Sequence, residues 1–334
     1  MITPTRLSYG VLIATIALAV LLHLGVPLLV LLFSYFALRQ LYFLTKRKWL
    51  ALILFGVVVA GITAAAVYFT RTAILALPDV ADTSIPSASA WAQKRQIELP
   101  FTDFESLRQA VVDTLGQEAQ YLRNVANFAK SAAAAIVFGI LGIVAAGSLF
   151  YKTGLDPYRG THRLKNNLYS ICCDKVSTRF RDFYRSFATV MGAQITISLI
   201  NTALTGIFLV AVRLPHAPLL IAVTFLCGLV PIVGNLASNT VIVFVALTVS
   251  LKLAIVALVF LILIHKLEYL LNSKIIGDRI RNPVWLTLIA LILGERLMGI
   301  PGLILAPVVL NYLRVEMLTV EVPAPPETVD ALNR

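Results

Sequence analysis

The 334-residue chain is apolar and basic: hydrophobic residues make up 59%, charged residues 13%, and the formal net charge is +11. Soluble domains usually contain about 45–50% hydrophobic and about 25% charged residues. A chain with this composition lacks the polar surface that a water-soluble particle needs. The composition therefore excludes a cytosolic enzyme, a secreted disulfide scaffold and a disordered chain, and it predicts an all-α integral membrane protein whose main partner is the lipid bilayer.

Three apolar runs near the N-terminus, at residues 7–23, 26–44 and 49–69, predict three membrane helices. The first resembles a signal peptide, but it lacks a convincing small-residue cleavage site and two further spans follow at once, so we expect an uncleaved helix. Residues 131–151 predict a fourth membrane helix, rich in Ala and Gly, and residues 187–212 a fifth.

Two polar segments between these spans carry apolar residues at helical spacing and predict interfacial amphipathic helices. Residues 101–129 open with a capping box, Thr102 and Glu105. Either the membrane surface or the protein itself would cover the apolar face of that segment. Residues 164–187 have a basic background, which favours the anionic cytoplasmic leaflet.

The C-terminal third contains two long apolar runs that are interrupted by Gly and Pro. Residues 219–251 are broken by Gly228, Pro231 and Gly234, and residues 284–313 are broken between positions 294 and 302. A 33-residue run is too long for one untilted crossing. Each run therefore predicts a re-entrant hairpin of two half-helices, with an ordinary span at residues 253–271 between them.

The distribution of basic residues supports these hairpins. If the N-terminus is cytoplasmic, the loop at residues 46–48 and the basic segment at residues 152–186 are also cytoplasmic, as the positive-inside rule requires. The basic loop around Lys274 and Arg281 is cytoplasmic only if residues 219–251 turn back within the membrane. A second hairpin then places the C-terminus in the cytoplasm as well.

The fold class that follows has about eight membrane segments, including the two broken hairpins. In chain order, the regions are an N-terminal three-helix membrane region (1–69), an extracytoplasmic amphipathic segment (70–130), a fourth membrane helix (131–151), a basic cytoplasmic amphipathic segment (152–186), a C-terminal core with broken hairpins (187–314) and a disordered cytoplasmic tail (315–334).

Polar residues within the apolar runs are the candidate functional residues, because polar groups in hydrocarbon are costly. They form three sets: one face of residues 187–212, the first break, and the ionisable and break residues further along the chain. The sets are Gln194, Ser198, Asn201 and Thr205; Pro231, Gly234, Asn235, Ser238 and Asn239; and His265, Glu268 and Asn272 with Glu295, Arg296, Gly299, Pro301 and Gly302.

Each set has a structural interpretation beside the functional one. The face that starts at Gln194 could line a path or only form interhelical hydrogen bonds. The first break could be a packing kink, or it could expose backbone and Asn oxygens that bind an ion or a substrate, as broken transporter helices do. Glu268 could exchange protons or extend to the inner surface, and Glu295 and Arg296 could each pair elsewhere.

Enzyme and metal signals are absent from the sequence. It has no phosphate-binding glycine loop, no His-Glu-x-x-His and no nucleophile elbow. Cys172 and Cys173 are adjacent and Cys227 lies in an apolar run, so neither a disulfide nor a metal site is expected. We therefore expect no enzyme activity, no metal, no cofactor and no nucleic-acid partner.

The order of three C-terminal motifs resembles the autoinducer-2 exporter family of bacterial membrane proteins. The motifs are Gly-Leu-Val-Pro-Ile-Val-Gly at residues 228–234, Lys-Ile-Ile-Gly at 274–277 followed by Pro283, and Gly-Ile-Pro-Gly-Leu-Ile-Leu-Ala-Pro-Val-Val-Leu at 299–310. The sequence departs from the family pattern at Ser273, which stands in place of a proline, and Glu268 lies about one residue out of register.

The resemblance implies a multi-pass protein of the bacterial inner membrane that exports small molecules, with some members similar to sodium/proton antiporters, and it implies a homo-oligomer. We therefore predict a permease that exports a small solute or exchanges ions, coupled to Na⁺ or H⁺. The alternatives are a passive channel and a non-transporting scaffold that recruits partners through residues 152–186.

Overall fold

The computed structural model describes residues 4–93, 118–152, 167–230, 233–275 and 283–319, and this part of the chain is almost entirely helical, without strands. The helices are α1 (Pro4–Leu21), α2 (Gly25–Thr45), α3 (Lys48–Gln93), α5 (Glu118–Tyr151), α6 (Leu168–Ala211), α7 (Ala217–Gly228), α8 (Val233–Val249), α9 (Leu251–Ile275), α10 (Val284–Met298) and α11 (Ile300–Leu318).

The predicted all-α membrane class is confirmed. Five stretches of the described helices are long and apolar enough to cross a membrane, and three shorter apolar helices accompany them. The five are Gly25–Thr45, Lys48–Thr72, Ala133–Tyr151, Leu168–Ala211 and Ile300–Leu318. Many large apolar side chains on these helices are exposed, as a lipid-facing surface requires.

Helix α6 joins two predicted elements, because residues 168–186 of the basic segment and the predicted fifth span form one continuous helix of 44 residues. Its N-cap is Asn167, whose side chain accepts a hydrogen bond of 2.8 Å from the Ser170 backbone N–H. No proline interrupts residues 168–211. A helix of this length extends about 66 Å, roughly twice the thickness of the hydrocarbon core.

Helices α3 and α5 also run beyond their predicted ends. Helix α3 continues through the polar boundary at residue 70 to Gln93, and α5 already begins at Glu118. Residues 94–117, which include the Thr102–Glu105 capping box, lie outside the described residues. The predicted disordered tail at residues 315–334 was wrong at its start, because α11 continues to Leu318, and residues 320–334 lie outside the described residues.

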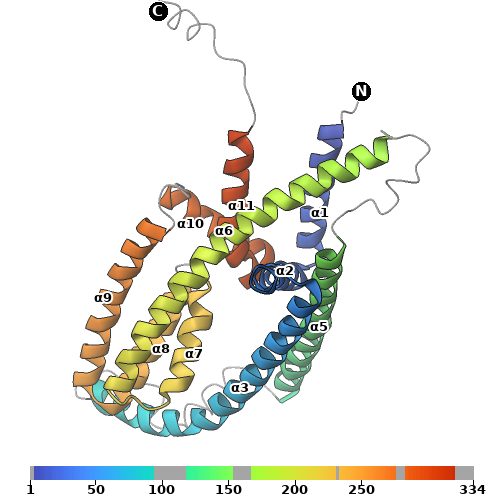
Figure 1. The fold of residues 1–334 in the computed structure, drawn as a ribbon. Helices are drawn as coiled ribbons and strands as arrows, with labels where there is room; N and C mark the ends of the chain where they lie inside the picture. The colour runs from blue at the N-terminus through green and yellow to red at the C-terminus, as the bar shows by residue number, and fades with distance from the viewer. Residues whose placement is uncertain (1–3, 94–117, 153–166, 231–232, 276–282, 320–334) are drawn as a thin grey trace, which may run out of the picture.

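Three apolar cores hold the helices together, and α6, which runs across the molecule in Figure 1, belongs to two of them. The first joins α2, the middle of α6 and α11 around Phe187 and Val308. The second joins the end of α6 to α7, α8 and α9 around Leu209 and Ile242. The third joins α2, α3 and α5 around Leu38. Helix α6 therefore connects the α11 side of the molecule to the α7–α9 side.

The two predicted breaks are present, and glycines at both breaks allow close backbone approach. A side chain at Gly234 would overlap the carbonyl oxygen of Cys227, so α8 can pack against the end of α7 only with glycine there. Gly294 and Gly302 face one another across the second break, each against the other's carbonyl. Gly299 joins α10 to α11 with a positive φ of 63°, which favours glycine.

Candidate functional site

The polar face of α6 packs against the C-terminal end of α7. Gln194 Nε2 donates a 2.6 Å hydrogen bond to the Gly228 carbonyl, and Ser198 Oγ donates a 2.9 Å bond to the Phe225 carbonyl. The last carbonyls of a helix have no partner within that helix, and no water is available in hydrocarbon. These two side chains therefore satisfy the α7 backbone where the helix stops, which is the structural interpretation of this part of the face.

Asn201 lies further along the same face and has a different environment. It is buried, with 8% of its surface exposed, and its Oδ1 has no hydrogen-bond partner among the described residues. Asn201 and Glu268 line a small pocket between α6 and α9, whose other walls are apolar: Ile197, Ile200, Leu204, Ile264 and Leu267. The polar face of α6 thus ends in an unpartnered amide oxygen.

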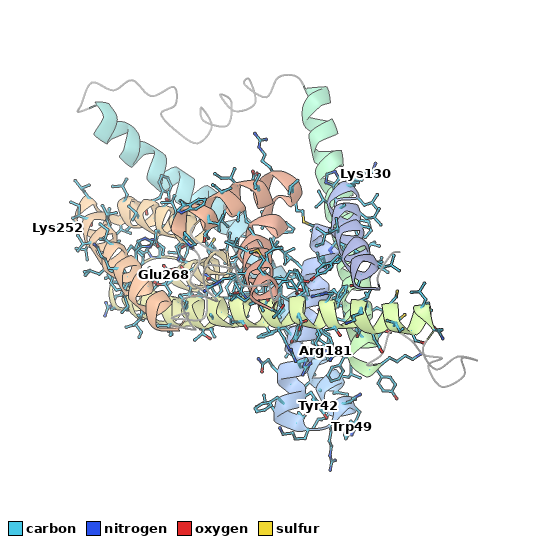
Figure 2. The ribbon with its side chains drawn as sticks, turned by 90° about the horizontal axis from the view of Figure 1, so that it is seen from above. Tyr42, Trp49, Lys130, Arg181, Lys252 and Glu268 are labelled. Carbon is cyan, nitrogen blue, oxygen red and sulfur yellow. The ribbon has the colours of Figure 1, made fainter. Side chains whose placement is uncertain are left out.

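Glu268 on α9 is also bound by the first turn of α8. Asn235 Nδ2 donates a 2.6 Å hydrogen bond to Glu268 Oε1, and both residues are buried. The break positions Asn235, because α8 begins only two residues earlier, at Val233. Ser238 Oγ donates to the Asn235 carbonyl at 3.2 Å. Figure 2 shows Glu268 among these crowded helices and Lys252 near the other end of α9.

His265 is the charged or titratable group nearest to the Glu268 carboxylate in the described contacts. Its Nδ1 lies 3.6 Å from Glu268 Oε2, and its side chain is 67% exposed. That separation exceeds hydrogen-bond length, so Oε2 remains without a hydrogen-bond partner among the described residues. One carboxylate oxygen is thus held by Asn235, and the other is buried and available.

The structure brings together only part of the predicted site. Asn201 and Glu268 line the same pocket, and Asn235 is hydrogen-bonded to Glu268. Asn239 is half-buried one turn along α8. Glu295 and Arg296 are exposed on α10. Pro231 lies outside the described residues, and the side chain of Asn272 is not among those described.

The second break shapes a different part of the molecule. Pro301, just beyond Gly299, packs against the start of α2, where a side chain added at Gly25 would come within 2.8 Å of Pro301 Cβ. Gly302 is buried against Gly294. The residues of this break therefore fix helix packing beside α2 and do not line the pocket between α6 and α9.

Sequence reasoning missed a polar cluster that joins α1, α6 and α11. Arg179 pairs with Glu316, and Tyr9 Oη donates a 2.7 Å hydrogen bond to Glu316 Oε1. The Arg179 guanidinium also lies over the Tyr9 ring, 4.2 Å from its centroid. These residues are up to 307 positions apart in sequence, so no spacing pattern could indicate the contact. The cluster holds the beginning of α1 beside the end of α11.

No group of three or more His, Cys, Asp or Glu side chains that could hold a metal ion occurs within the described ranges. The site is instead built from amide and carboxylate oxygens on separate helices of an apolar bundle. A model of the AI-2E family transporter matches residues 9–319. The chain belongs to the AI-2E family.

A curated relative supports the same assignment. The chain is 27% identical over 187 residues to YdbI of Bacillus subtilis (strain 168), a relative that is named as a transport protein. The match covers 55% of the chain, and the chain spans about half the length of that relative. The protein is thus a membrane protein of a transporter family, as the resemblance in the C-terminal motifs indicated.

Proposed function

We propose that the protein is a permease of the bacterial inner membrane whose path passes between α6, the α7–α8 break and α9. The observation that carries the proposal is the polar cluster of Asn201, Asn235 and Glu268 inside an apolar helical bundle. Ionisable and amide groups at such positions are expensive in hydrocarbon and mark substrate or ion pathways. A broken helix beside them is the arrangement in which many secondary transporters bind their cargo.

The transported species is a small solute, exported, or an ion exchanged in antiport, with Na⁺ or H⁺ as the coupling ion. The sequence contains no nucleotide-binding motif, so we propose that the energy comes from an ion gradient or from the solute gradient. Each broken helix pair is proposed to enter and leave the membrane on one side, with both termini cytoplasmic. In support, Tyr9 near the start of α1 contacts Glu316 near the end of α11.

Flux measurements in proteoliposomes test the permease and separate it from the alternatives. Accumulation of a solute or ion against its gradient, abolished by a protonophore or by removing Na⁺, supports a coupled transporter. Downhill movement alone indicates a passive channel, and no flux in an ion and solute screen indicates a scaffold. We expect Asn235→Ala combined with Asn239→Ala to abolish flux, and unchanged flux in that variant would refute the assignment of the path.

A further inference from the structure

Three helices each present one buried oxygen without a partner around Glu268, which lines one pocket with Asn201 and is hydrogen-bonded to Asn235. The atoms are Asn201 Oδ1 on α6, Asn235 Oδ1 on α8 and Glu268 Oε2 on α9, and none has a hydrogen-bond partner among the described residues. The three residues are 8%, 5% and 8% exposed. Buried polar atoms are normally satisfied, so three in one cluster indicate that a ligand completes them.

The chemistry of these atoms defines the ligand. Amide and ionised carboxylate oxygens only accept hydrogen bonds or bind cations, and the donor of Asn235 is already used on Glu268 Oε1. An oxygen-only set is the kind that hard cations prefer. We infer that Asn201, Asn235 and Glu268 form a binding site for a dehydrated monovalent cation of about the size of Na⁺.

Charge and space favour a single small positive charge. The site contains one carboxylate, and a monovalent ion neutralises it, whereas a divalent ion would leave a surplus charge in the low-dielectric interior. The pocket beside Asn201 and Glu268 is too tight for a water molecule, so the ion is bound without its hydration shell.

His265 is the group that would compete with the cation. It lies 3.6 Å from Glu268 Oε2, and its imidazolium form would offset the carboxylate. The exposure of His265, 67%, keeps it at the edge of the cluster, whereas the cation lies between the three oxygens. The inference rests on the proposed path, because it names what binds there, but its test does not need transport.

The test measures the thermal stability of the purified full-length protein in detergent as NaCl replaces choline chloride at constant ionic strength. A cation that binds the folded state raises the melting temperature increasingly with its concentration. We expect this rise in the wild type and a smaller one when KCl replaces NaCl. In Asn201→Leu and Glu268→Gln we expect the apparent Na⁺ affinity to fall about tenfold or more.

Two features of the design keep the outcome interpretable. Glu268→Gln retains the shape of the side chain and an oxygen for Asn235, so the variant should fold. Asn311→Leu is the matched control, because Asn311 is likewise a buried asparagine, on α11, and the variant should keep the wild-type Na⁺ response.

Equal stabilisation by NaCl, KCl and choline chloride would overturn the inference, and so would a Na⁺ response that persists in both site variants. Flux in proteoliposomes without Na⁺-specific stabilisation would refute the cation site but support the permease. Na⁺-specific stabilisation without any flux would support the cation site but refute the permease.

Discussion

Gly234→Ala should destabilise the protein because no space exists for a methyl group between α7 and α8. The added Cβ would overlap the Cys227 carbonyl oxygen and would lie 2.5 Å from the carbonyl carbon. Both are backbone atoms, so no flexible side chain can move aside. Overpacking of this kind costs about 1–3 kcal/mol, and here it would also push Asn235 away from Glu268.

Gly139→Ala on α5 is the matched control, since nothing lies within 4 Å of a Cβ added there. Alanine in a helix interior is more favourable than glycine by about 0.5–1 kcal/mol. The two variants should therefore differ by roughly 1.5–4 kcal/mol in the free energy of unfolding.

Reversible unfolding in mixed micelles would measure that difference, and flux in proteoliposomes would show whether the site moves with the break. Equal stability of Gly234→Ala and Gly139→Ala would refute the close packing of α7 against α8. Reduced stability with normal flux would refute the link between the break and the site.

Three further substitutions test other parts of the structure. Gln194→Leu removes the donor to the Gly228 carbonyl and should cost about 0.6–2 kcal/mol of unfolding free energy, measured in the same micelles. Glu316→Gln should cost about 1–3 kcal/mol because it leaves the Arg179 charge largely buried without its partner, and a double-mutant cycle with Arg179→Gln should show coupling. Gly299→Ala should cost about 1–3 kcal/mol through strain at its positive φ, whereas unchanged stability would contradict the observed geometry.

The sequence predicts the breaks well because Gly and Pro act locally. The positive φ at Gly299 and the tight approach at Gly234 both occur at interruptions visible in the apolar runs. Helix ends were predicted less well: apolarity marks where a helix leaves hydrocarbon, not where it stops. Helix α6 includes residues 168–186 of the basic segment, where apolar residues recur at helical spacing, and α3 continues past residue 70 to Gln93.

The sequence could predict which residues are candidates for the site, but not which of them contact one another. Periodicity places Gln194, Ser198 and Asn201 on one face, but it cannot show that the first two bind the end of α7 while Asn201 stays unpartnered. The pairing of Asn235 with Glu268 depends on how α8 packs against α9. Glu295 was as strong a candidate as Glu268 in the sequence, but its side chain is exposed. Tertiary packing decides which of the two carboxylates is buried.

We propose that the break between α7 and α8 turns the chain back within the membrane, so that α9 runs from the outer to the inner side. Accessibility of single engineered cysteines at Lys252 and Lys274 in intact cells tests it most directly, after Cys172, Cys173 and Cys227 are replaced by serine. We expect an impermeant thiol reagent to modify the cysteine at position 252 and not the one at position 274. Ready modification at position 274 with protection at position 252 would contradict it.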